Sequence, residues 1–288
     1  MVTSPVETLS ADLPQLLDVE ALVLPRLITL GQILPLHRVF VIMKTPLLVA
    51  VGLYLAGGPF RLPSAIWTMV LAALLWTTLY ALNEYTDLVQ EEGYAKSPVL
   101  LVGLLGAPVL CCALAGIVSQ NLLPLFVGMM LGQMAYCVPP IRLKRFWWAG
   151  LIFSGMVNPL LRVQCGAIWG LAAISPVVYA TIVCLHLGSA IRTRMLQRER
   201  DRRLSYRVVP QAVWIFSIIS VGAGMAGMYW MCALSILPPA FYLFVTLGAA
   251  FTLYAWSGRI TNIRQVRRGW AWFSLLAILA LIVLIKFH

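Results

Sequence analysis

Nine apolar stretches divide this chain, and each is about as long as a helix must be to cross the hydrocarbon core of a membrane. Turn-forming residues separate them, and prolines stand near the start of several, where the missing amide hydrogen costs a helix little. The stretches lie near residues 37–57, 63–83, 98–118, 121–139, 148–171, 175–193, 210–233, 236–256 and 270–287. The pattern predicts an all-α fold, a polytopic membrane bundle of nine transmembrane helices.

The composition excludes an ordinary soluble domain. Only 11% of the residues are charged and 61% are hydrophobic, whereas about a quarter of the residues in a soluble domain are charged. Lipid must therefore be the solvent for most of this apolar surface. The net charge of +11 fits arginines held at the cytoplasmic face of a membrane, so we predict no nucleic-acid partner.

Basic residues fall on one side of the predicted bundle. If the first segment begins inside, the loops after segments two, four, six and eight are cytoplasmic. The basic residues of these loops are Lys96, Arg142, Lys144, Arg145, the arginines from Arg194 to Arg207, Arg259, Arg264, Arg267 and Arg268. The opposite loops and the C-terminus hold little more than Arg61 and Lys286. The positive-inside rule then predicts a cytoplasmic N-terminus and an outside C-terminus, in a bacterial-type cytoplasmic membrane.

Residues 1–33 differ from the rest of the chain. Four acids stand there among leucines, namely Glu7, Asp12, Asp18 and Glu20. This pattern predicts a short amphipathic helix that lies at the membrane interface. Because an acidic helix gains nothing from anionic lipids, we expect it to dock on the chain's own basic loops or on a partner. Residues 34–288 are predicted to form a single nine-helix transmembrane domain.

Only six acidic residues lie outside this N-terminal segment. They are Glu84, Asp87, Glu91, Glu92, Glu199 and Asp201. Asn83, Asp87 and Glu91 stand four residues apart, so on a helix they share one face and rise about 6 Å at each step. Such a ladder of oxygen ligands suits Mg²⁺, which favours carboxylates together with the phosphate oxygens of a substrate. A solvated helix end whose acids face neighbouring arginines explains the spacing equally well.

Two motifs give the chain a family resemblance. The run from Asn83 to Glu91 reads N-E-Y-T-D-L-V-Q-E. It is similar to the N-D-x-x-D-x-x-x-D signature of the UbiA-type intramembrane aromatic prenyltransferases, with glutamate at two aspartate positions. The run from Tyr136 to Arg145 reads Y-C-V-P-P-I-R-L-K-R and resembles that family's Y-x-x-P-P-x-R-x-K-R stretch. Together with the nine segments, the resemblance covers most of the chain after residue 35.

The resemblance implies a fold and a reaction. Nine helices would surround a central cavity, and Mg²⁺ would hold the diphosphate of a polyprenyl donor. The allylic C–O bond would ionise, and a lipophilic or aromatic acceptor (a quinone precursor, a tetrapyrrole or similar) would capture the carbocation. Metal and cationic side chains would stabilise the charge on the leaving diphosphate. Matched to the motifs, catalysis and metal binding fall to Asn83, Asp87 and Glu91, and diphosphate binding falls to Arg142 and Lys144.

The family's second acidic signature is altered here. The corresponding stretch, from Arg194 to Leu204, keeps the closing acids Glu199 and Asp201, but Arg194 stands where a leading acid is usual. On a helix Glu199 and Asp201 point about 200° apart, so they cannot both face one metal ion. Asp201 is still a candidate metal ligand, but the second Mg²⁺ site that the family implies lacks a full set of ligands.

Two interpretations of this stretch stay open. In the first, Arg194 and Arg198 lie one helical turn apart, replace a metal and clamp the diphosphate, while a single Mg²⁺ binds at the first motif. In the second, catalysis has been lost. The seven arginines between residues 192 and 207 then dock a protein partner or contact anionic lipid.

Polar residues inside the segments indicate a candidate cavity. Lys44 lies in the first segment, and Asn158 and Arg162 lie in the fifth. An ionisable group at membrane depth normally faces the bundle interior or a cavity, where these side chains could reach the diphosphate or an acceptor carboxylate. Alternatively, Lys44 snorkels to the interface and Arg162 hydrogen-bonds backbone carbonyls.

Two functions of different classes follow. The first is a Mg²⁺-dependent transfer of a prenyl group from a polyprenyl diphosphate to a lipophilic acceptor. The second is a catalytically degenerate membrane subunit that binds a lipid, quinone or pigment and docks partners in a larger complex through residues 192–207. A transporter is disfavoured, because the segments show no inverted repeat and no acid lies at mid-membrane depth.

Overall fold

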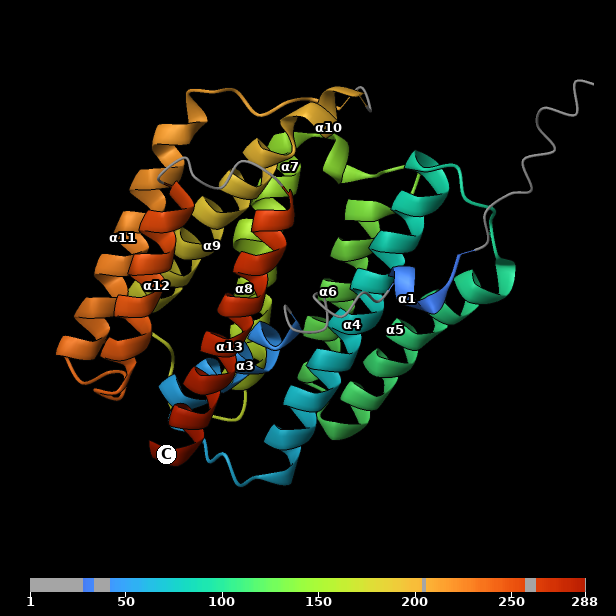
Figure 1. The fold of residues 1–288 in the computed structure, drawn as a ribbon. Helices are drawn as coiled ribbons and strands as arrows, with labels where there is room; N and C mark the ends of the chain where they lie inside the picture. Colours follow the sequence, from blue (N-terminus) through green and yellow to red (C-terminus); the bar gives the residue numbers. More distant parts are fainter. Residues whose placement is uncertain (1–27, 34–41, 204–205, 257–262, 288) are drawn as a thin grey trace, which may run out of the picture.

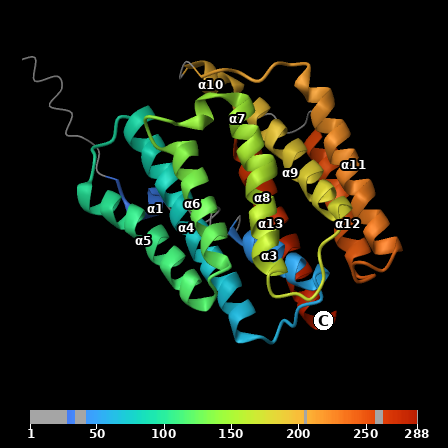
Figure 2. The same cartoon turned by 180° about the vertical axis from the view of Figure 1, so that it is seen from behind.

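The computed structural model describes residues 28–33, 42–203, 206–256 and 263–287, and within these ranges every regular element is helical. Figure 1 and Figure 2 show the long helices side by side in one bundle, with connections at its two ends. In chain order the helices are α1 (Leu30–Ile33), α3 (Lys44–Leu55), α4 (Pro63–Glu91), α5 (Pro98–Val118), α6 (Leu122–Cys137), η1 (Leu143–Arg145), α7 (Trp147–Ile152), η2 (Phe153–Val157), α8 (Asn158–Ala167), α9 (Pro176–Leu196), α10 (Arg198–Arg203), α11 (Val213–Ala233), α12 (Phe241–Trp256) and α13 (Ile263–Phe287).

Each of the nine predicted segments contains a helix among the described residues. The fifth is the most irregular, because α7 passes through the π-helical turn η2 into α8. Pro159, at the start of α8, lacks an amide hydrogen, and its ring crowds the carbonyl four residues earlier, at Gly155. A π turn at this point accommodates the lost hydrogen bond. Gly155 also lets α9 approach, since a Cβ there would lie 2.8 Å from Leu187 Cα.

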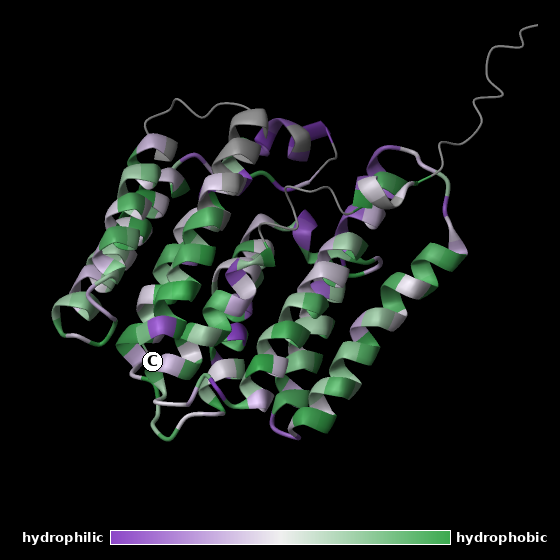
Figure 3. Cartoon of the chain, turned by 60° about the horizontal axis from the view of Figure 1, so that its bottom comes forward, coloured by the Kyte–Doolittle hydropathy of each residue, from purple (hydrophilic) through white to green (hydrophobic). Residues whose placement is uncertain are grey.

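Four of the described helices, α4, α5, α9 and α11, are long and apolar enough to cross a membrane, and shorter apolar helices stand beside them. Large apolar side chains such as Trp67, Val99 and Ile219 are exposed. Figure 3 shows mostly apolar helices with hydrophilic stretches in and near the connections. The chain is therefore an integral, multi-pass membrane protein. Nine crossings and an inside N-terminus stay predictions, and the acidic segment predicted within residues 1–33 lies mostly outside the described residues.

Glycines bring α3 and α8 into backbone contact. A Cβ added at Gly52 would collide with the carbonyl oxygen of Val163, and one at Gly166 would collide with the carbonyl oxygen of Val49. Membrane helices use small residues for such close packing, because lipid provides no hydrophobic drive for helices to associate. This contact holds α8, and with it Arg162, against α3.

Replacing Gly166 by valine should therefore destabilise the protein by about 1–3 kcal/mol, because the backbone of α3 must move to make room. The measurement is the midpoint of thermal unfolding in detergent micelles. Gly103→Val on α5 is the matched control, since a Cβ at Gly103 meets no atom within 4 Å. Equal midpoints for the two variants would contradict the contact between α3 and α8.

One end of the bundle gathers the residues that the motifs single out. The helix α4 has 29 residues and is about 43 Å long, whereas about 20 residues cross a hydrocarbon core. Its last turns, from Asn83 to Glu91, therefore extend past the core. The α6–α7 connection and α10 lie at the same end of the bundle (Figure 1).

Candidate functional site

Two acids on α4 form the centre of the candidate site. Asp87 and Glu91 stand one turn apart on α4, and their side chains are only 12% and 6% exposed. Carboxylates at the C-terminal end of a helix oppose the helix dipole. Buried carboxylates at this position therefore need positive charges close to them.

These positive charges come from the connection between α6 and α7. Arg142 adopts a left-handed conformation, with a φ angle of 43°, which costs a non-glycine residue about 1–2 kcal/mol. Arg142 and Lys144, on either side of Leu143, are both buried and both reach α4. A strained conformation persists only where its surroundings impose it. The contacts of Arg142 and Lys144 with α4 therefore hold this turn in place.

Asp87, Glu91, Arg142 and Lys144 form one buried group, which we call the charge cluster. Lys144 Nζ forms an ion pair with Asp87 Oδ1 and lies 3.8 Å from Glu91 Oε1. Arg142 Nη2 lies 2.8 Å from Glu91 Oε1 and 4.0 Å from Asp87 Oδ1. The two positive and two negative charges balance, which lets all four side chains leave water.

Tyr206, in the connection after α10, adds a neutral donor to the charge cluster. Its hydroxyl donates a hydrogen bond of 2.8 Å to Glu91 Oε1, and its ring centroid lies 5.3 Å from the Arg142 guanidinium. Burial, and after it the bond to Glu91, raises the pKa of Tyr206 to about 12, so the hydroxyl stays protonated at neutral pH. Sequence reasoning missed Tyr206, because a tyrosine in an arginine-rich loop carries no pattern that points to a distant carboxylate.

Arg194, near the end of α9, contacts the backbone of the loop that carries Lys144 and so supports the charge cluster. Its Nη2 donates to the backbone oxygen of Lys144 at 2.8 Å and to the Tyr136 hydroxyl at 3.3 Å. Its Nη1 lies 3.5 Å from Asp201 Oδ2, in an ion pair whose two side chains are buried. Gly150 leaves room for the guanidinium, because a Cβ there would lie 2.7 Å from Arg194 Nη2. One side chain thus joins α6, α9, α10 and the loop that carries Lys144.

The rest of the stretch from Arg194 to Leu204 lies in different surroundings. The helix α9 ends before Arg198, where α10 begins, so Arg194 and Arg198 do not share a continuous helix. Arg198 Nη1 makes a long contact of 3.5 Å with Gln211 Oε1, next to the start of α11. Glu199 is exposed, whereas Asp201 is buried. The prediction that these two acids face different ways is confirmed.

The α4 ladder also carries an unsatisfied oxygen. Asn83 Oδ1 is buried and has no hydrogen-bond partner among the described residues, one turn before Asp87. Buried acceptors are normally satisfied, so this one calls for an explanation. Within the part of the chain that the structure describes, no three histidine, cysteine, aspartate or glutamate side chains gather as a ready metal site.

The predicted cavity residues lie along α3 and α8. Arg162 is 2% exposed, and its guanidinium lies 3.8 Å from the ring centroid of Trp76 on α4, a cation–π contact that strengthens away from water. Asn158, one turn earlier on α8, is buried, and its Oδ1 has no hydrogen-bond partner among the described residues. Lys44 begins α3. Trp76 was not predicted, because it closes an apolar run that gives no sign of a polar contact.

No family model matches the sequence, and no curated protein matches it significantly. Solved structures do match. A UbiA homologue from Archaeoglobus fulgidus bound to Cd²⁺ has 17% sequence identity and a TM-score of 0.67, over 88% of this chain and 99% of that one. The chain has the UbiA-type fold. The resemblance inferred from the two motifs is thereby confirmed.

Two further structures extend the comparison. A UbiA homologue from Archaeoglobus fulgidus bound to DMAPP and Mg²⁺ is 18% identical, with a TM-score of 0.63 over 89% of this chain and 100% of that one. A digeranylgeranylglyceryl phosphate synthase is 15% identical, with a TM-score of 0.59 over 89% of this chain and 99% of that one. The UbiA-type fold therefore describes the bundle as a whole. At such identities function has to be argued from the site.

Proposed function

We propose that this protein transfers a prenyl group from a polyprenyl diphosphate to a lipophilic or aromatic acceptor, such as a quinone precursor or a tetrapyrrole. The observation that carries the proposal is the buried charge cluster, at one end of a bundle with the UbiA-type fold. Two solved structures with this fold are of UbiA homologues bound to DMAPP and Mg²⁺ and to GPP and Mg²⁺. The same class of donor suits the cations of this cluster.

Arg142 and Lys144 are proposed to hold the diphosphate. When the allylic C–O bond of the donor ionises, negative charge develops on the oxygen that leaves. Arg142 offers a planar pair of donors and Lys144 a point charge, and both are in place before the reaction begins. Preorganised donors of this kind stabilise developing charge strongly where water is excluded. Until a donor binds, Asp87 and Glu91 serve as counter-ions, so neither cation is buried alone.

The α4 ladder fits one Mg²⁺ ion. Asn83, Asp87 and Glu91 offer three oxygen-bearing groups on one helix face, and the unsatisfied Asn83 oxygen is available as a ligand. With phosphate oxygens of a donor, these groups match the oxygen shell that Mg²⁺ prefers. The ion would supply Lewis-acid neutralisation of the diphosphate. In the stretch from Arg194 to Leu204, Asp201 is buried against Arg194 and Glu199 is exposed, so no second set of ligands comes together among its described residues and we propose one magnesium site rather than two.

Arg194 is proposed to position Lys144. Its guanidinium is engaged by the Lys144 backbone, by Tyr136 and by Asp201, which leaves it little freedom to turn toward a diphosphate. Removing it should therefore act on the placement of Lys144. Arg198, the other half of the predicted clamp, contacts Gln211 instead.

Diphosphate release tests the proposed function. Detergent-purified protein is supplied with geranyl, farnesyl, geranylgeranyl or phytyl diphosphate, in Mg²⁺ or in EDTA. We expect release from at least one donor, and we expect it to require Mg²⁺. A folded, monodisperse sample that releases no diphosphate above a blank without protein would contradict the proposal for these donors.

A second candidate function is a non-catalytic membrane subunit that binds a lipid, quinone or pigment and docks partners through residues 192–207. The observation that favours it is the buried ion pair of Arg194 and Asp201, 3.5 Å apart. This pair stands where the family resemblance implies metal ligands. The alternative predicts no diphosphate release from any donor, together with co-purification of other subunits from gently solubilised membranes.

A further inference from the structure

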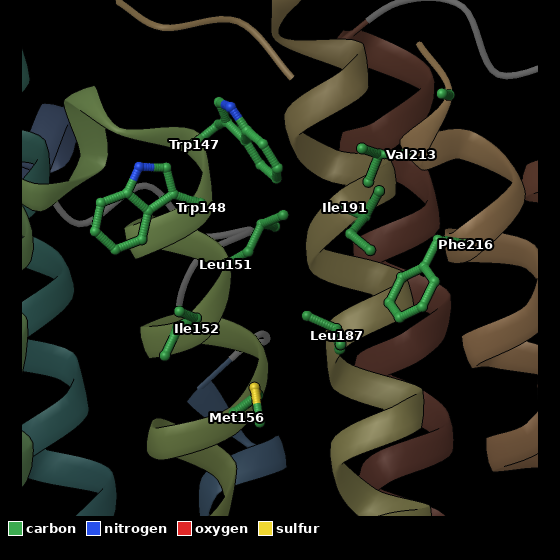
Figure 4. Close-up of a pocket in the computed structure, with 10 residues that line it drawn as sticks. Trp147, Trp148, Leu151, Ile152, Met156, Leu187, Ile191, Val213 and Phe216 are labelled. Atoms are coloured by element: carbon green, nitrogen blue, oxygen red, sulfur yellow. The ribbon is translucent and has the colours of Figure 1, made fainter. Parts of the chain in front are cut away.

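A groove on the flank of the bundle shares no lining residue with the charge cluster. It has a volume of about 470 Å³ and is lined by residues of α7, η2, α9 and α11 together with Ala212. Figure 4 shows Leu151 and Met156 on one wall, and Leu187 and Ile191 across from them. The residues that line the groove carry no charge.

The groove opens onto the surface that meets lipid. Trp148 and Phe216 line it and are 50% and 54% exposed. In a multi-pass membrane protein a hydrocarbon chain suits such an opening, because the lining side chains offer no polar group with which water could form hydrogen bonds. Apolar faces of other helices meet lipid as well, so the hydrophobic lining alone selects no particular occupant.

Arg198 contacts the residue that directly precedes the groove-lining start of α11. Its Nη1 lies 3.5 Å from the side-chain oxygen of Gln211, and the groove-lining residues Ala212 and Val213 follow directly in the chain. Its Nε is buried without a hydrogen-bond partner among the described residues. Gln211 is neutral, so this contact leaves the charge of the guanidinium uncompensated.

Arg207 approaches the groove from the side of α7. Its guanidinium lies 5.3 Å from the ring centroid of Phe146. Phe146 directly precedes the groove residue Trp147, and the ring centroids of Phe146 and Trp148 lie 6.2 Å apart. The Arg207 amide donates to the backbone oxygen of Arg145 at 3.0 Å, which fixes the loop beside α7. Among the described residues, no acid forms an ion pair with Arg198 or Arg207.

We propose that this groove binds an acyl chain of an anionic membrane phospholipid, whose phosphate is held by Arg198 and Arg207. An apolar groove with arginines beside the residues that precede its α7 and α11 walls complements a molecule with a hydrocarbon chain and an anionic head. A zwitterionic lipid such as phosphatidylcholine would fill the groove, but the choline cation beside its phosphate would offset the attraction of the arginines. The proposed prenyl donor has other cations, Arg142 and Lys144, so this inference does not depend on the proposed function.

Quenching of tryptophan fluorescence tests the inference, because Trp147 and Trp148 line the groove and bromine on a nearby acyl chain quenches tryptophan. Detergent-purified protein is titrated with phosphatidylglycerol that carries brominated acyl chains, and separately with phosphatidylcholine that carries the same chains. We expect saturable quenching by phosphatidylglycerol at concentrations where phosphatidylcholine quenches little. Equal quenching by the two lipids would show ordinary contact with surrounding lipid and would overturn the proposal.

Variants at the cationic end test the headgroup contact. One arginine beside an anionic headgroup strengthens binding about fivefold, so the double variant Arg198→Gln/Arg207→Gln should bind phosphatidylglycerol roughly 25-fold more weakly than the wild type. Arg203→Gln is the matched control, since Arg203 is an exposed arginine of α10, and it should keep the wild-type affinity. Equal affinities for the double variant and the control would overturn the proposal.

Variants inside the groove test the position of the acyl chain. Ile152→Phe/Val213→Phe adds bulk to two residues that line the groove, one of which is 47% exposed, and should abolish saturable quenching without lowering the midpoint of thermal unfolding. Saturable quenching that survives in this variant would place the lipid elsewhere. If one of the two double variants fails to fold, the other decides. Displacement of the brominated lipid by farnesyl diphosphate would assign the groove to the donor and overturn the proposal.

Discussion

Replacing Asp87 by asparagine is expected to lower Mg²⁺-dependent diphosphate release by a factor of about 10²–10³, the usual effect of removing one electrostatic contributor to a transition state. The substitution keeps the size of the side chain. It removes the charge that pairs with Lys144 and that is proposed to hold the metal ion. The rate is measured at saturating donor, with wild-type and variant protein purified in the same detergent.

Loss of activity has to be separated from loss of the fold. In Asp87→Asn the buried Lys144 keeps the more distant contact with Glu91, at 3.8 Å. Breaking a buried ion pair lowers the free energy of unfolding by about 3–5 kcal/mol. The double variant Asp87→Asn/Lys144→Met removes both charges. It should regain most of the lost stability, because replacing a whole buried pair is nearly neutral, yet it should stay inactive. An active double variant would contradict the assigned roles of both residues.

Glu92→Gln is the matched control for Asp87→Asn. It removes one carboxylate from the same end of α4, but Glu92 is exposed and lies outside the charge cluster. We expect the wild-type rate of release. If both variants lowered the rate equally, the charge at this end of the protein, rather than the cluster, would set the rate.

The helices could be predicted from the sequence because lipid leaves a chain few choices. Every backbone polar group in the hydrocarbon core must be satisfied within its own segment, so length and apolarity suffice to predict a helix. The π turn at Phe153–Val157 could not be predicted in this way. Pro159 predicts an irregular turn in this helix, but the geometry of that turn also depends on α9, which packs against Gly155.

The ladder of acids could also be predicted, but its surroundings could not. The spacing of Asp87 and Glu91 left two interpretations open, a metal-binding face and a solvated helix end that faces arginines. The structure combines parts of both, because the acids face Arg142 and Lys144 but are buried with them. Lys144 stands 57 residues from Asp87 in the chain, and no periodic pattern specifies a contact over that distance.

The stretch from Arg194 to Leu204 shows why a helical pattern misleads at a helix end. The prediction that Arg194 and Arg198 lie on one face assumed a continuous helix. The helix α9 ends at Leu196, and Gln197 caps it before α10 begins. Arginine, leucine and glutamine are all good helix formers, so the sequence carries no local signal for the break.

Replacing Arg194 by methionine is expected to destabilise the protein by about 3–5 kcal/mol, the cost of removing one partner from a buried ion pair. Methionine is also long and flexible, so little volume is lost. The change takes the cation away from Asp201, which is 3% exposed, and takes a donor away from the backbone oxygen of Lys144. The measurement is the midpoint of thermal unfolding in detergent, and Arg203→Met on the exposed face of α10 is the control.

A second substitution distinguishes a support for Lys144 from a ligand of the diphosphate. Arg194→Met/Asp201→Asn removes both charges of the pair, so it should recover most of the stability. If Arg194 positions Lys144, this variant should still release diphosphate, but with a raised KM for the donor, because Lys144 stays in the site on a less ordered loop. If Arg194 itself stabilises the leaving group, kcat should fall by about 10²–10³ in the restored fold. A wild-type unfolding midpoint for Arg194→Met alone would contradict the buried pair on which both readings depend.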